Sequence, residues 1–320
     1  MGNSIGEYSD IKYNKYSKLL WIEENSKYSG FEKSEFQFRR NNTSYHVKIT
    51  LFHTEKHIEI VSNSLVELEQ LYLLIGEIRR YEYLFDGAFY ILRKCTVDDE
   101  DITNVIGKAE VGYFQNAGYK HKIPLDLNDK EYKKYFLRWI AVEKKLGIIS
   151  QMVLYANNVR GIPADVRMAM LAECYESLAK NLKRKGLIRI IPEPDTNRLV
   201  YCPNCKQEHG INISGKVTLA CCLSAILENY GKPVFTTEYR RRKSLVKRIV
   251  KTRNKVFHVN NRQKKTLKGS NSGFYVIKLE WMYRYIVWLL MGFDRGRLDE
   301  IVSKQILKFE HDFPDLIYVR

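Results

Sequence analysis

Arg253, Asn254 and His258 bring side chains suited to phosphate chemistry together within six residues of the sequence. A guanidinium offers phosphate a planar fork of N–H donors. An imidazole takes up or releases a proton near neutral pH. The surrounding segment, residues 243–265, contains no acidic residue. This pattern favours chemistry on a polyanion.

Arg253 interrupts an otherwise regular amphipathic helix. The helical repeat puts it in the middle of an apolar stripe. A cation there needs a counter-charge, because an unpaired buried charge is strongly destabilising. Two explanations stay open: a snorkelling side chain or an ion pair with a distant carboxylate, and a phosphate bound in a cleft or subunit interface. The stripe consists of Leu245, Val246, Ile249, Val250, Val256 and Phe257.

His258 lies at a less favourable angle. Five residues of straight helix turn it roughly 140° away from Arg253. The two side chains can share one site only if the helix bends or ends near Phe257, or if a second subunit completes the pair. The sequence "VNNRQ" at 259–263 is a suitable helix terminator.

A second group of residues has the spacing of a metal site. The stretch "YCPNCKQEHG" holds two cysteines in a Cys-x-x-Cys arrangement, which suits tetrahedral zinc. A second pair of cysteines is absent from this stretch, so a loop with two free thiols is the alternative, and a bridge across a dimer is another arrangement. Any zinc here is expected to be structural. The candidate ligands are Cys202, Cys205, His209 and Cys221.

Charge is concentrated rather than spread along the chain. The formal net charge is +16, and no Asp or Glu occurs from Tyr239 to Leu279. By contrast, residues 98–101 read "DDED". A basic patch of this kind favours a partner with a phosphate backbone, whereas a uniformly lysine-rich surface would not be polarised in this way.

The elements that must position these residues fall into two parts. Alternating patterns at 34–40, 44–53 and 56–62 predict strands, and a helical pattern begins near Ser64. After about residue 125 the pattern is mostly helical, with a break expected at Gly147. We therefore predict an α+β protein. Its β-rich N-terminal domain covers residues 1–125, and a helical bundle covers 126–320 with an irregular insert at about 187–216.

The sequence favours a cytoplasmic location without membrane attachment. Its N-terminus has no hydrophobic secretory core. Its most apolar run, 286–293, is far too short to cross a bilayer.

The six-residue motif resembles the signature of HEPN domains. Arg-Asn-x-x-x-His occurs in this strict form only at 253–258, late in a helical region. The order of a β-rich module, a long helical stretch and a late motif resembles ApeA-type HEPN proteins. Many HEPN proteins are RNases of toxins, CRISPR effectors and phage defence. The resemblance implies a bundle of helices that dimerises around the motif.

The same resemblance implies metal-independent cleavage of RNA through its own 2′-OH, which leaves 2′,3′-cyclic phosphate ends. No catalytic cofactor is implied. His258 would act as general base or acid, Arg253 would hold the phosphate, and Asn254 would orient them. The flanking basic residues would bind RNA phosphates: Arg240, Arg241, Arg242, Lys243, Lys251, Lys255, Arg262, Lys264 and Lys265.

Two other interpretations remain open. The chain can be a nucleic-acid-binding or regulatory HEPN protein without catalysis, in which Arg253 is structural. It can also be a metalloenzyme or zinc-dependent regulator. If it is a defence nuclease, we expect the N-terminal domain to sense a trigger, such as a phage-derived molecule, or to restrain the nuclease.

Overall fold

The computed structural model describes residues 14–24, 33–52, 55–110, 122–159, 161–193, 199–201, 203–210, 215–258 and 265–317. These residues form two compact units. The first unit contains residues 1–147, 157–161 and 287–301 within its bounds, and the second contains 148–156, 162–286 and 302–320. Each unit is a set of residues that lie close together in space, and it combines segments that are distant in the sequence. Such a division does not test the domain boundary predicted near residue 125, which stays a prediction.

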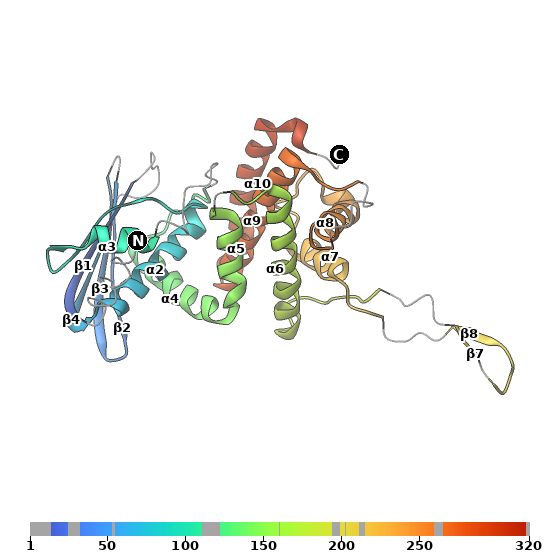
Figure 1. Cartoon of the computed structure of the whole chain (residues 1–320), viewed down its shortest axis with the longest axis horizontal. Coiled ribbons are helices and arrows are strands. Elements are labelled where there is room, and N and C mark those ends of the chain that lie inside the picture. Colours follow the sequence, from blue (N-terminus) through green and yellow to red (C-terminus); the bar gives the residue numbers. More distant parts are fainter. Residues whose placement is uncertain are drawn as a thin grey trace. The chain divides into compact units, whose positions relative to one another are not determined.

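The first unit is built on an antiparallel sheet with the order β2-β3-β4-β1-β5-β6. Helix α2 lies against one face of it (Figure 1). The three predicted strands are present, and β1 is an addition that sequence patterns did not reveal. The strands are β1 (Lys15–Glu24), β2 (Lys33–Arg40), β3 (Thr43–Leu51), β4 (Glu55–Glu67), β5 (Leu92–Val97) and β6 (Glu100–Asp101).

The first helix starts later than the sequence suggested. Strand β4 continues through Ser64, and α2 begins at Leu68 after Glu67, whose side chain makes no capping bond. Sheet pairing between β4 and β1 extends to Glu67 and therefore takes precedence over the local capping signal. The helices of this unit are α2 (Leu68–Asp86), α3 (Thr103–Glu110) and α4 (Asp129–Leu146).

Apolar and aromatic side chains fill the space between the sheet and its helices. Trp21 and Ile58 of the sheet and Ile78 of α2 are fully buried. Phe136 of α4 packs against Phe36 of β2, with 5.3 Å between their ring centroids. The alternation of buried and exposed residues along the strands is what positions this core on one face of the sheet.

The second unit is helical. Helices α6, α7 and α8 pack against one another. Gly147, at φ 51, separates α4 from α5 and confirms the break expected there. The helices that lie wholly or mainly in this unit are α5 (Ile148–Asn158), α6 (Ala164–Arg184), α7 (Leu219–Tyr230), α8 (Arg242–Phe257), α9 (Gly269–Leu290) and α10 (Arg295–Asp312).

The irregular insert contains a short hairpin of β7 (Leu199–Tyr201) and β8 (Glu208–Gly210). Helix α9 begins at Gly269, although the β-branched and aromatic residues near its start favour a strand locally. Burial accounts for the difference, because Tyr275 and Leu279 are both fully enclosed in the bundle. The predicted α+β architecture, a β-rich module followed by a helical region, is confirmed.

Within the described residues, no helix is both long and apolar enough to span a membrane.

Candidate nuclease site

The apolar stripe of α8 is buried only along its first turns. Leu245, Val246 and Ile249 are enclosed, whereas Val250 is half-buried and Phe257 is 47% exposed. Arg253 therefore sits where the stripe emerges from the bundle, and 23% of its side chain is exposed. In this position, one side of the guanidinium contacts other protein side chains and the other side is accessible to solvent.

Helix α8 ends at Phe257, directly before His258. The amide of His258 still donates to the carbonyl of Asn254 at 3.1 Å, but its φ of −100° and ψ of 7° leave the helical path. The imidazole consequently turns back over the last helical turn. Its Nε2 lies 3.0 Å from Nη1 of Arg253. The helix end thus brings the two side chains together within one chain.

The contact between Arg253 and His258 joins the guanidinium to one ring nitrogen. Because a guanidinium can only donate, Nε2 of His258 is the accepting atom of this hydrogen bond. Nη1 of Arg253 also donates to Oδ1 of Asn254 at 3.0 Å. All three motif residues therefore belong to one hydrogen-bonded group.

Glu173 is a fourth member that the sequence did not reveal. It lies on α6, eighty residues before Arg253 in the chain, and its Oε1 accepts from Nε of Arg253 at 2.5 Å. A distant carboxylate was one of the two explanations for the buried arginine, and this ion pair is present. A single sequence holds no signal that distinguishes Glu173 from its neighbour Glu176, which pairs with Lys180 instead.

One edge of the guanidinium remains open. Nε is bound by Glu173, and Nη1 by Asn254 and His258. Nη2 has no partner among the residues that the structure describes. The Phe257 ring lies 5.6 Å from the guanidinium carbon. An anion that approaches this edge would contact the arginine beside Nε2 of the histidine.

The chain that follows the motif is tied back to α8 by Thr252. Its buried hydroxyl accepts from the amide of Leu267 and donates to the carbonyl of Arg248, both at 2.9 Å. Thr252 thereby holds Leu267, which precedes α9, against α8.

The predicted RNA-binding residues differ in their exposure to solvent. Arg240, Arg241, Lys243 and Lys265 are exposed. Lys251 and Lys255 are partly exposed. Arg262 and Lys264 lie outside the described residues.

Arg242 is engaged within the protein. Its Nη2 lies 3.5 Å from Oε1 of Glu228, and its guanidinium lies 5.0 Å from the centre of the Tyr239 ring. It is therefore less available to RNA than its neighbours are.

The described residues give no support for the metal site. Cys202 lies outside the described residues, and so does the side chain of His209. Cys205 is exposed on the turn of the hairpin. Cys221 is buried in the first turn of α7, where its Sγ lies 3.3 Å from the Thr218 hydroxyl. Among the described residues, no group of three or more potential ligands could hold a metal ion. The zinc site stays a prediction.

The neighbouring thiol of Cys222 suits a core residue rather than a ligand. Burial, reinforced by the nearby Glu176, raises its pKa to about 11. A thiol with that pKa is protonated at neutral pH when no metal is bound.

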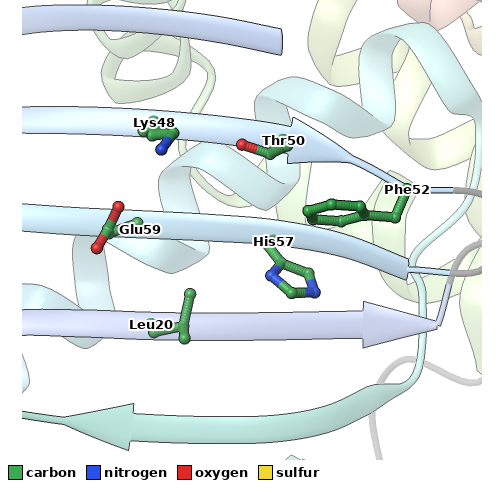
Figure 2. A pocket seen from close by; sticks show the side chains of 6 residues that line it. All are labelled: Leu20, Lys48, Thr50, Phe52, His57 and Glu59. Atoms are coloured by element: carbon green, nitrogen blue, oxygen red, sulfur yellow. The ribbon is translucent and has the colours of Figure 1, made fainter. Parts of the chain in front are cut away.

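The first unit carries a hollow on the face of its sheet that α2 does not cover. Its volume is about 430 Å³. Figure 2 shows five of the lining side chains on β1, β3 and β4 and Phe52 directly after β3, with helices on the far side of the strands. The rings of Phe52 and His57 lie 4.5 Å apart there. The lining residues are Leu20, Lys48, Thr50, Phe52, His57 and Glu59.

Comparison with known proteins gives one match. Residues 170–297 match a family model described as Apea-like HEPN. The matched segment includes Glu173 and all three motif residues. It confirms the predicted ApeA-type HEPN character of the helical region. No curated protein and no solved structure matches the chain.

Proposed function

We propose that this Apea-like HEPN protein is a metal-independent endoribonuclease. HEPN domains are generally RNases, and the family match covers the segment that carries the motif. The observation that supports catalysis most directly is the 3.0 Å contact between Nη1 of Arg253 and Nε2 of His258. A phosphate-binding cation and a proton acceptor side by side are what cleavage through a 2′-OH needs.

In the proposed reaction, the 2′ oxygen of the substrate attacks the adjacent phosphorus. The 2′-OH gives its proton to a base, for which His258 Nε2 is the candidate. The P–O5′ bond breaks, and the 5′ oxygen takes up a proton from an acid. The products carry a 2′,3′-cyclic phosphate and a 5′-OH. Atoms and charge balance without a metal or an external reagent.

Arg253 would stabilise the negative charge that grows on the phosphoryl oxygens. Its open Nη2 edge can meet the phosphate while Glu173 holds Nε. Asn254 would keep the guanidinium turned toward His258. Glu173 would act as a positioning residue, because it contacts the arginine rather than the reacting atoms.

We further propose that the protein works as a homodimer. One chain contributes one motif imidazole, whereas the reaction uses a base and an acid. A second copy facing the same groove would supply the other imidazole. HEPN domains typically dimerise, and the exposed Phe257 beside Arg253 gives the two copies an apolar surface to share.

The test uses purified wild-type protein and the Arg253→Ala and His258→Ala variants. Each is incubated with total RNA in EDTA, and the cut ends are mapped. We expect the wild type to cut and both variants to lose activity by several orders of magnitude. Cutting that persists in His258→Ala would overturn the proposed catalysis.

The alternative is a nucleic-acid-binding HEPN protein in which Arg253 is structural. The ion pair with Glu173 is the observation that favours it. In that case neither variant would change RNA integrity, although Arg253→Ala would lower thermal stability. Wild-type protein that binds RNA without cutting it would support this alternative.

A role in phage defence or as a toxin follows from the family. We propose that the N-terminal unit receives the trigger, and the hollow on its sheet provides a surface for it. Expression in phage-challenged cells tests this role. We expect wild-type protein to protect the culture or arrest its growth, and His258→Ala to do neither.

A further inference from the structure

The hollow on the sheet of the first unit has the dimensions of a small-ligand site. Its volume of about 430 Å³ lies toward the lower end of the usual range, roughly 300–1,000 Å³. It lies over β1, β3 and β4, and each of these strands is paired with a neighbour on both sides. An extended peptide joins a sheet through the open main-chain groups of an edge strand, which these inner strands do not offer. The position therefore favours a small molecule over a peptide.

Two rings form one end of the hollow (Figure 2). The side chain of Phe52 is 50% exposed, and its ring centroid lies 4.5 Å from that of His57. Nε2 of His57 lies 3.0 Å from Oε2 of Glu55, and this contact holds the imidazole beside Phe52. The amide of Phe52 donates to the carbonyl of Glu55 at 2.8 Å, which fixes its main chain. An exposed aromatic surface that is already held in place suits a planar ring, because stacking on it needs little reordering of the protein.

The other end of the hollow presents a donor next to an acceptor. Lys48 and Glu59 lie directly opposite each other on β3 and β4, so their Cβ atoms are about 5 Å apart. An ammonium group can only donate hydrogen bonds, and a carboxylate can only accept them. Lys18 contacts Oε1 of Glu59 at 3.2 Å, while Oε2 has no partner among the described residues. Lys48 makes no ion pair within the described chain, because Glu35 on its other side pairs with His46.

The lining side chains match the edge of a nucleobase better than they match a charged group. With the histidine neutral, they carry one positive and one negative formal charge, so a phosphate that Lys48 attracts is repelled by Glu59. A nucleobase carries acceptors and N–H donors side by side on its edge, and proteins read that edge while they stack on the ring. Thr50, between the two ends, adds a hydroxyl that can donate or accept.

We propose that the hollow binds the base of a free nucleotide. The base stacks on Phe52 and turns its donor and acceptor groups toward Lys48 and Glu59, while the sugar and phosphate stay on the open side. A strand of nucleic acid needs a series of aromatic platforms, and Phe52 is the one exposed aromatic residue among the described residues of this unit. This inference rests on the proposed function only where it makes the nucleotide the trigger of the N-terminal unit.

The test measures nucleotide binding by calorimetry in the His258→Ala background, so that it does not depend on cleavage. The probes are AMP, GMP, CMP and UMP, with ribose 5-phosphate as the ligand that lacks a base. Phe52→Ala is compared with Leu73→Ala, which shortens an exposed apolar side chain on α2. Lys48→Gln is compared with Lys94→Gln, which changes an exposed lysine on β5 outside the hollow. A melting curve shows that each variant is folded.

We expect at least one nucleotide to bind with a Kd below about 1 mM and ribose 5-phosphate not to bind. Phe52→Ala should weaken binding by about 5- to 150-fold, which is the effect of removing a stacking platform. Lys48→Gln should weaken it by about 10-fold through the loss of a charged donor. The two control variants should bind like the parent.

Three results would overturn the proposal. The first is that no nucleotide binds at about 1 mM, and the second is that Phe52→Ala binds as well as Leu73→Ala does. The third is a preference for free tryptophan or for a short oligonucleotide over every mononucleotide.

The ligand assignment and the nuclease function fail in different ways. Wild-type protein that binds a nucleotide in the hollow but never cuts RNA would contradict the nuclease function and leave the ligand assignment intact. Wild-type protein that cuts RNA but binds no nucleotide would contradict only the ligand assignment. As a trigger, the nucleotide should change the rate of RNA cleavage by wild-type protein and leave that of Phe52→Ala unchanged.

Discussion

Nη1 of Arg253 and Nε2 of His258 lie 3.0 Å apart in one chain, although a straight helix would turn them to different faces. The end of α8 at Phe257 resolves this. A second subunit is therefore not needed to bring the pair together. The case for a dimer depends instead on the need for a second proton-transfer group.

Glu173→Gln is expected to lower RNA cleavage on the order of 10- to 100-fold, because a guanidinium displaced by about 1 Å is no longer aligned with the phosphate. Glutamine keeps the shape but removes the charge that holds Nε. The loss should appear in kcat more than in KM, measured with one oligonucleotide substrate. The control is Glu176→Gln, one turn further along α6, which breaks only the pair with Lys180. Equal activity of the two variants would contradict a positioning role for Glu173.

Lys278→Met is expected to destabilise the second unit by about 3–5 kcal/mol, since it leaves buried carboxylates without their cation. Nζ of Lys278 is fully buried between Glu238 at 2.7 Å and Glu310 at 2.5 Å. This cluster anchors the segment before the basic residues of α8. Denaturant unfolding measures the loss. Lys304→Met, on the exposed side of α10, should leave the midpoint unchanged.

Glu310 should make the second unit sensitive to acid. Burial alone would raise its pKa, but Lys278 and the hydroxyls of Thr236 and Thr237 outweigh that effect and lower the pKa below its usual value. A carboxyl whose pKa is depressed by folding stabilises the protein above its unfolded pKa and loses this contribution as the pH falls through the folded pKa.

The melting temperature should therefore decline below about pH 4.5, the ordinary value for glutamate. Glu310→Gln should be less stable at pH 7 and show a shallower decline in acid. If the melting temperatures of the two proteins decline in parallel between pH 7 and pH 3, this role of Glu310 is contradicted.

Removal of metal is expected to leave catalysis unaffected, whether or not the hairpin holds a structural zinc ion. If the hairpin holds zinc, the purified protein should contain the metal and Cys205→Ser should lose it, as measured by elemental analysis. EDTA should leave RNA cleavage intact, because the proposed mechanism passes through no metal. Cleavage that stops in EDTA and returns with zinc would instead support the metalloenzyme interpretation.

Local sequence patterns determined three strands, one helix break and the position of the candidate site. Alternation at 34–62 marked three strands, Gly147 marked a helix break, and Arg253 to His258 marked the candidate site. Each of these depends on neighbours within a few residues, and short-range periodicity and backbone preference are legible in a single chain.

Tertiary contacts decided the rest. Strand β4 runs through Ser64 because it pairs with β1, and α9 is helical from its start because its aromatic side chains are enclosed. The counter-charge of Arg253 comes from α6, and no spacing rule links two residues eighty positions apart. Such partners are chosen by which helix faces pack together, and that choice exists only once the chain has folded.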